Sequence, residues 1–200
     1  MTQDTLQDRF LAMVLDNPVN RAILKRMPDL GIQDGWLVAG CLFGTVWNAL
    51  SNRPLTENIR DYDIFYYDPD TGYEAEDAVI RRGAALFADL GVEVEIRNQA
   101  RVPLWFKARF GVPYAPISES RTGIDRFVVA GTCSGISQAG EVHAPFGFED
   151  MFAGVLRRNP MNPTPHQFQF KCGSYRERWP WLKVVEKETV AYKETAAHTA

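Results

Sequence analysis

Two aspartates separated by one residue carry the clearest chemical signal in the sequence. Asp61 and Asp63 lead directly into the apolar run Ile64-Phe65-Tyr66-Tyr67, which is typical of a β-strand. Alternate side chains of a strand point to the same face, so both carboxylates are expected to face the same way. Carboxylates held this close repel each other, and a divalent cation removes the repulsion. Because oxygen ligands of this kind suit Mg²⁺ or Mn²⁺, the pair predicts a metal site.

A third acidic side chain is available on the next predicted strand. Residues 92–97 alternate between apolar and charged side chains, which places Glu93 and Glu95 on one face. Either glutamate could complete a three-carboxylate metal site, and the strand pattern does not choose between them. We favour Glu95 because it lies nearer the polar run Arg97-Asn98-Gln99.

Glycines before the aspartates add a second feature. Gly40 and Gly44 follow the apolar run 36–39 and precede a helical stripe at residues 46–50. A glycine at such a junction lets the backbone approach a phosphate, which the free N–H groups of the helix would bind. The alternative is that each glycine only permits close packing of strand and helix. The nearby Asp-x-Asp favours the phosphate interpretation.

The elements that must position these residues alternate between helix and strand. The expected helices cover residues 5–16, 19–27, 46–50 and 73–90, and the expected strands cover residues 36–39, 61–67 and 92–97. This order predicts an α/β (α+β) fold in which helices pack on a small mixed sheet. In the second half, helices are expected at 148–156, 164–178 and 180–187, and an edge segment at 142–146. Residues 120–130 fit either helix or strand.

Composition limits the number of domains and the class of partner. With 200 residues, 46% of them hydrophobic, the chain is expected to form one domain over 1–187, with a core at about 36–102, a mixed helical extension at 103–187 and a flexible tail at 188–200. The net charge of −3 makes sequence-independent binding to nucleic acid unexpected. Five basic residues near the end are interpreted as a solvated helix face, with a local basic patch as the alternative: Lys171, Arg176, Arg178, Lys183 and Lys187.

The cysteines and apolar segments exclude two further classes. The three cysteines, at 41, 133 and 172, have neither the spacing of a zinc site nor the even number of a disulfide framework. No apolar run reaches the roughly 20 residues that a membrane helix needs, and the first residues lack the pattern of a secretion signal. The chain is therefore expected to be cytoplasmic, with no membrane partner.

These motifs together resemble a known family. A Gly40-Cys41 turn, a helix, Asp61-x-Asp63 and a later acidic strand are similar to the nucleotidyltransferases of polymerase-β type. More narrowly, the chain resembles bacterial nucleotidyltransferase-like proteins, a largely uncharacterised group. The matching blocks span roughly 36 to 182 and are Leu37–Gly40, Val46–Leu50, Asp61–Asp68, Asn98–Val102, Ala144–Phe152, Arg158–Pro160 and Arg178–Pro180.

The resemblance implies a sheet of nucleotidyltransferase type with a helical C-terminal region. It also implies Mg²⁺- or Mn²⁺-dependent transfer of a nucleotidyl group from an NTP to an acceptor. Asp61 and Asp63 would be the catalytic metal ligands, with Glu95 as the third. Gly40, Cys41 and Gly44 would lie near the triphosphate, and Asn98 and Arg101 would orient or neutralise phosphate.

Cys41 and the undecided third acidic residue keep a second interpretation open. Cys41 replaces the usual glycine or serine, and Pro103 stands where histidine is common. The alternative is a degenerate member that binds a nucleotide or a partner without turnover. For Asn98 and Arg101, the alternative is that the Asn-Gln-Ala-Arg run caps a strand end. The acceptor, the base preference and the oligomeric state are not predicted.

Overall fold

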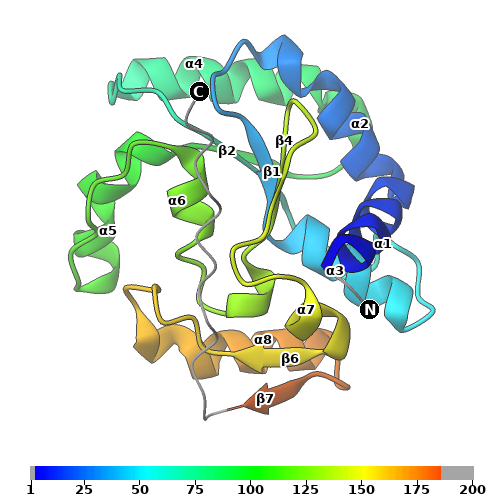
Figure 1. The fold of residues 1–200 in the computed structure, drawn as a ribbon. Coiled ribbons are helices and arrows are strands. Elements are labelled where there is room, and N and C mark those ends of the chain that lie inside the picture. Colours follow the sequence, from blue (N-terminus) through cyan, green and yellow to red (C-terminus); the bar gives the residue numbers. More distant parts are fainter. Residues whose placement is uncertain (1–2, 186–200) are drawn as a thin grey trace.

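A mixed sheet carries the two aspartates. The computed structural model describes residues 3–185 and contains a five-stranded sheet in the order β3-β2-β1-β4-β5 (Figure 1). β2 and β3 are parallel, and the remaining neighbours in this sheet are antiparallel. The predicted α/β class with a mixed sheet is therefore confirmed. Two of the five strands, β4 and β5, come from beyond residue 102, so the sheet extends past the expected core.

The elements follow one another with short connections. The strands are β1 (Trp36–Val38), β2 (Tyr62–Tyr66), β3 (Val94–Asn98), β4 (Gly135–Ser137), β5 (Val142–His143), β6 (Val155–Arg157) and β7 (Lys183–Val185). The α-helices are α1 (Gln3–Asp16), α2 (Pro18–Arg26), α3 (Gly40–Leu50), α4 (Tyr73–Leu86), α5 (Val102–Phe110), α6 (Ser120–Ile124), α7 (Glu149–Ala153) and α8 (Phe168–Arg178). Short 3₁₀ turns cover Met27–Leu30, Ala88–Leu90, Gln99–Arg101, Ala130–Thr132 and Pro165–Gln167.

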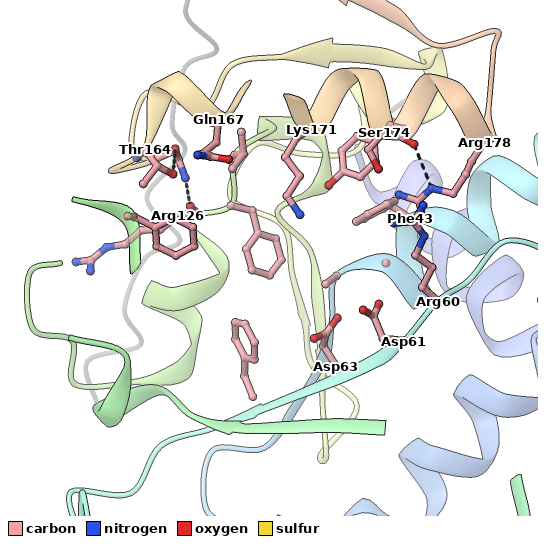
Figure 2. Close-up of a pocket in the computed structure, with 18 of the residues that line it drawn as sticks. Phe43, Arg60, Asp61, Asp63, Arg126, Thr164, Gln167, Lys171, Ser174 and Arg178 are labelled. Carbon is pink, nitrogen blue, oxygen red and sulfur yellow. Dashed lines mark hydrogen bonds between the residues drawn. The ribbon is translucent and has the colours of Figure 1, made fainter. Parts of the chain in front are cut away.

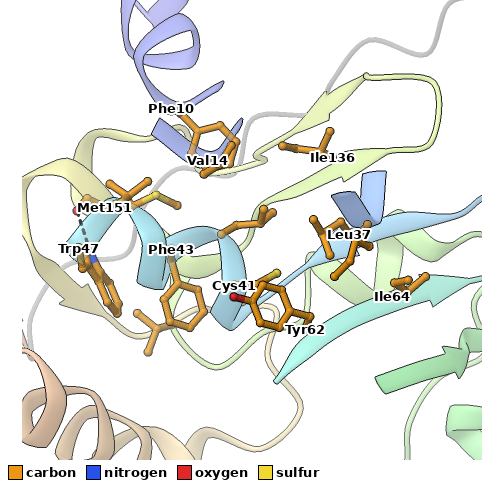
Figure 3. Packing of buried hydrophobic residues seen from close by; sticks show 14 of the residues in the cluster. Phe10, Val14, Leu37, Cys41, Phe43, Trp47, Tyr62, Ile64, Ile136 and Met151 are labelled. Atoms are coloured by element: carbon orange, nitrogen blue, oxygen red, sulfur yellow. Dashed lines mark hydrogen bonds between the residues drawn. The ribbon is translucent and has the colours of Figure 1, made fainter. Parts of the chain in front are cut away.

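Strand β2 separates the core from the face that carries the aspartates. Its side chains alternate, with Tyr62, Ile64 and Tyr66 buried and Asp63 and Phe65 partly exposed. The buried face packs against α1 and α3 in the main hydrophobic core (Figure 3), whose labelled members are Phe10, Val14, Leu37, Cys41, Phe43, Trp47, Tyr62, Ile64, Ile136 and Met151. Burial of one face thus fixes which side chains the other face can offer to a ligand.

The C-terminal part differs from the sequence prediction in two places. The expected helix at 180–187 is wrong over its described part, because Lys183–Val185 forms β7, which pairs in parallel with β6, and residues 186 and 187 lie outside the described range. The expected helix at 148–156 is too long: α7 ends at Ala153, where Gly154 adopts a left-handed φ of 66°, and Val155 begins β6. Both segments are too short for periodicity to outweigh strand pairing formed in the folded chain.

The remaining predicted segments lie between residues 120 and 146 and at the C-terminus. Residues 120–130 form a short helix, α6, followed by an irregular segment, and the expected edge segment contains the edge strand β5. The expected tail at 188–200 lies outside the described residues. Within residues 3–185, no helix combines the length and apolar character needed to cross a bilayer.

Candidate active site

Asp61 and Asp63 face a single cavity of about 400 Å³ (Figure 2). Asp61 immediately precedes β2 and Asp63 is its second residue, so the alternation of the strand brings both carboxylates to one side. Pockets that hold small molecules begin at roughly 300 Å³. The cavity is therefore large enough for a small-molecule ligand to lie against both aspartates.

The environment of Asp63 disfavours its charged form. Burial, the charge of Asp61 and the charge of Glu95 together raise the pKa of the Asp63 carboxyl from 3.8 to about 7, while Lys171 and Arg97 oppose the shift. A carboxylate in this position gains from any cation that enters the cavity. The pair thus has the electrostatic character of a cation site.

Asp63→Asn is expected to stabilise the metal-free protein at pH 8. Because the folded-state pKa is raised, ionisation of Asp63 lowers stability progressively as the pH rises from 3.8 to about 7. Removing the charge should raise the free energy of unfolding at pH 8 by about 2 kcal/mol, which corresponds to a Tm higher by about 4–8 °C. The difference should shrink toward pH 4, where the parent carboxyl is already protonated.

Thermal unfolding in EDTA across this pH range measures the effect, with Asp8→Asn, on the exposed face of α1, as the control. A Tm difference that does not change with pH would contradict the assignment of the shift to Asp63.

The first turn of α3 forms the next part of the cavity wall. The chain leaves β1 through Ala39, which has a left-handed φ of 63°, and α3 begins at Gly40. A Cβ on Gly40 would lie 3.6 Å from Asp61 Oδ1, so this backbone lies close to the aspartate. The first N–H groups of a helix lack partners within it and carry partial positive charge. The turn can therefore bind an anion beside Asp61.

Helix α8 and its N-cap residue Gln167 contribute a row of polar side chains that the sequence did not place at the site. Gln167, Lys171, Ser174 and Arg178 all line the cavity and recur at spacings of four, three and four residues. The neighbouring stripe of Phe168, Cys172, Tyr175 and Trp179 is buried and fixes the orientation of the helix. Lys171 is exposed, as the interpretation of a solvated face expects, but Lys171 and Arg178 also line the cavity, which agrees with the alternative of a local basic patch. The repeat of polar residues beside the buried stripe is the signal that could have found them.

Strand β2 and helix α8 run along the cavity in opposite directions. Arg178 lies close enough to Arg60 and Asp61 for their charges to act on its pKa. Lys171 lies close enough to Asp63 to lower the pKa of that carboxyl. Figure 2 shows Lys171 pointing into the space above the aspartates, with Arg60 and Arg178 on one side. Positive charge is therefore concentrated at the Asp61 end and at the middle of the cavity.

The opposite end is mainly apolar and aromatic. Its phenylalanines are Phe65, Phe106, Phe110 and Phe127, and Arg126, Asn162 and Thr164 complete the wall. The Arg126 guanidinium at this end is engaged elsewhere, because it lies 4.5 Å from the Tyr114 ring centroid and its Nη1 donates to the Ala115 carbonyl oxygen at 2.7 Å.

Hydrogen bonds hold the segment that contributes Phe127. Asn159 Nδ2 donates to the carbonyl oxygens of Asp125 and Phe127, each at 2.6 Å. The buried His143 lies 2.6 Å from Asp125 Oδ1. His143 thus has a structural partner.

Comparison with known proteins matches this geometry to a family. A family model described as nucleotidyltransferase matches residues 25–184, which is most of the chain. The chain belongs to this nucleotidyltransferase family. An NMR structure described as revealing a CCA-adding enzyme head domain is similar to it, with 25% sequence identity and a TM-score of 0.72. The match covers 90% of this chain and 96% of that one. Comparison with curated proteins finds no match.

The nucleotidyltransferase does not form the expected three-carboxylate cluster in residues 3–185. No group of three or more His, Cys, Asp or Glu side chains in that range could hold a metal ion. Glu95 pairs with Asp63 in register, but its Oε2 accepts a hydrogen bond from Arg97 Nη2 and it does not line the cavity. Glu93 is exposed, one residue before β3. A role for either glutamate as a ligand stays a prediction.

Two aspartates still fit a magnesium site. Mg²⁺ is commonly held by one or two carboxylates together with substrate phosphates and water, rather than by a cage made entirely of protein groups. Asp61 and Asp63 face a cavity that a phosphate can enter, and the raised pKa of Asp63 reflects repulsion that a cation would relieve. The two aspartates therefore suit a metal ion that arrives bound to a phosphate ligand.

The structure places the other predicted nucleotide-binding residues away from the cavity. Asn98 is buried, and its side chain bonds to the backbone of Asp68, Asp70 and Ala100. Arg101 forms an ion pair with Glu76 and donates to the carbonyl of Thr71. These contacts agree with the alternative in which the run caps a strand end.

Cys41 and Gly44 also serve packing. Cys41 is buried, burial raises the pKa of its thiol, and its Sγ donates to the Val38 carbonyl at 3.1 Å. A Cβ on Gly44 would lie 3.3 Å from the Trp179 ring, so this glycine permits α3 and α8 to approach. Of the three residues predicted around the helix start, Gly40 alone lines the cavity.

Proposed function

We propose that the protein transfers a nucleotidyl group from an NTP to an acceptor in a reaction that requires Mg²⁺ or Mn²⁺. The observation that carries the proposal is the arrangement of charge in the cavity. Asp61 and Asp63 lie across from Lys171, with Arg60 and Arg178 beside them (Figure 2). Among residues 3–185, the side chains of Lys171 and Arg60 form no hydrogen bond and no ion pair. Cations without partners beside a carboxylate pair suit a metal–triphosphate complex.

Each group has a role that follows from its charge. Asp61 and Asp63 would hold the metal ion, which supplies neutralisation of the charge that develops on the transferring phosphate. Lys171, opposite Asp63, would contact the α-phosphate. Arg60, Arg178 and the first turn of α3 would hold the β- and γ-phosphates, because this end carries the positive charge.

The proposed step leaves atoms and charge balanced. A nucleophilic atom of the acceptor forms a bond to the α-phosphorus, and the bond from that phosphorus to the bridging oxygen breaks. Pyrophosphate leaves with the electron pair, and the proton of the acceptor is released to water. Arg60 and Arg178 stabilise the charge that accumulates on the leaving pyrophosphate, and Lys171 stabilises the charge on the transferring α-phosphate. Fixed positive groups of this kind need no rearrangement during the reaction.

Incubation with α-labelled NTPs, Mg²⁺ or Mn²⁺ and a pool of acceptors tests the proposal. The pool should contain RNA, because the similar structure is described as a CCA-adding enzyme head domain, together with proteins and small molecules. Transfer of label that stops in EDTA is the expected result. Binding of NTP without transfer to any acceptor in the pool would instead support the degenerate binding protein. The observation that favours this second function is the absence of a three-carboxylate cluster among residues 3–185.

A further inference from the structure

The two ends of the cavity differ in a way that bears on substrate orientation. This inference rests on the proposed function, and it concerns which part of the NTP each end receives. Along β2, the residues on the cavity face are Asp61, Asp63 and then Phe65, with roughly 7 Å between successive members. Along α8 and its N-cap residue, the corresponding order is Arg178, Lys171 and Gln167. On both walls, the charged residues are therefore followed in the same direction by uncharged ones, Phe65 on β2 and Gln167 before α8.

The aromatic end presents rings that are open to a ligand. Phe65 and Phe127 are half-buried and meet edge to face, with ring centroids 5.8 Å apart. Phe110, also half-buried, extends this surface from α5. The aromatic residues at the charged end, Phe43 and Tyr175, are buried in the main core instead. A planar ligand can therefore pack on rings at the Phe65 end.

Gln167 adds a polar group to this apolar end. Its side chain lines the cavity and has no hydrogen-bond partner among residues 3–185. The neighbouring polar side chains of Asn162 and Thr164 are occupied: Asn162 Nδ2 donates to the Arg126 carbonyl, and Thr164 Oγ1 donates to Asn162 Oδ1. Figure 2 shows Gln167 near Thr164, on the far side of Lys171 from Arg60 and Arg178. An amide both donates and accepts, as the edge of a nucleobase does.

We infer that the NTP lies along the cavity with its triphosphate toward Arg60 and Arg178 and its nucleobase on Phe65 and Phe127, where Gln167 contacts the edge of the base. The positive end cannot hold the base as well as it holds phosphate, because its rings are buried and its charged groups are the cations Arg60 and Arg178. Stacking on Phe65 and Phe127 is tolerant of base identity. Gln167 is therefore the residue that we expect to discriminate among bases, through hydrogen bonds to the base edge.

Binding of unreactive ligands tests the orientation apart from catalysis. The ligands are the four α,β-methylene NTP analogues and inorganic tripolyphosphate, each titrated calorimetrically with Mg²⁺. Phe127→Leu is expected to weaken all four analogues by at least about fivefold while changing tripolyphosphate less than twofold. Gln167→Ala should weaken the preferred analogue by about fivefold and narrow the differences among the four. Lys171→Ala should weaken the analogues and tripolyphosphate alike.

Controls separate this inference from the proposed function. Phe170→Leu is the matched control for Phe127→Leu, because Phe170 is 72% exposed on α8 and does not line the cavity. Phe65→Leu provides a second test if Phe127→Leu unfolds. If both tripolyphosphate and the NTP analogues bind, and Phe127→Leu, Phe65→Leu and Gln167→Ala leave these affinities unchanged, the base lies elsewhere. That result would overturn this inference but not the proposed function. Failure of both ligand classes to bind would overturn the proposed function as well.

Discussion

Asp61→Asn and Asp63→Asn are each expected to reduce nucleotidyl transfer by at least about 10²–10³-fold. Asparagine keeps the size of the side chain but removes the charge that a divalent ion requires. Both residues line the cavity opposite Lys171, so each substitution acts where metal and phosphate would meet. Transfer of label from an α-labelled NTP to the acceptor measures the effect, and titration with Mn²⁺ followed by electron paramagnetic resonance provides a readout independent of activity.

The controls make the result specific to the site. Asp8→Asn, on the exposed face of α1, should retain full activity and the same Mn²⁺ binding. Both site variants should remain folded, and Asp63→Asn should unfold at a higher temperature than the parent at pH 8. A variant that keeps its transfer activity would remove that aspartate from the proposed mechanism.

Trp179→Ala is expected to lower the free energy of unfolding by about 3–5 kcal/mol. The Trp179 side chain is fully buried, its ring centroid lies 5.2 Å from that of Trp47, and its Nε1 donates to Asn48 Oδ1 at 2.7 Å. The ring also contacts the face of α3 at Gly44. Removing it leaves a cavity and an unsatisfied amide between α3 and α8. Urea denaturation measures the loss.

Two comparisons show where the loss originates. Trp179→Phe keeps an aromatic ring but leaves Asn48 Oδ1 without its donor, so its cost should be smaller, about 1–3 kcal/mol. Trp105→Ala removes a ring that is 40% exposed on α5 and should cost less than about 1 kcal/mol. Equal losses for Trp179→Ala and Trp105→Ala would mean that the contact between α3 and α8 does not support the fold as described.

Trp179 also connects stability to the site. Its ring lies under the Arg178 guanidinium, 4.6 Å from the ring centroid, and the buried stripe of α8 sets the direction in which Lys171 points. A variant with a loosened α8 should therefore bind tripolyphosphate less well even at a temperature where it remains folded. The anchoring of the helix is part of what positions the cations.

Features of the site with short-range causes could be predicted from the sequence. Asp61 and Asp63 share a face because side chains alternate along any strand, and Gly40 lies beside them because β1 leads directly into α3. Features that depend on distant partners could not. Asn98 and Arg101 looked available for phosphate, yet their hydrogen bonds go to Asp68, Asp70, Thr71 and Glu76, which a strand pattern does not reveal.

The sequence by itself determined the alternation of helix and strand, the shared orientation of the two aspartates and the resemblance to nucleotidyltransferases. Each depends on residues within a few positions of one another or on recognisable blocks. The tertiary structure decided which face of α8 meets the aspartates, that 183–185 pairs with β6, and that Phe65 and Phe127 form one surface. The physical reason is that these contacts join segments far apart in the chain. They form through packing of the buried stripe and pairing of strands, which no local pattern encodes.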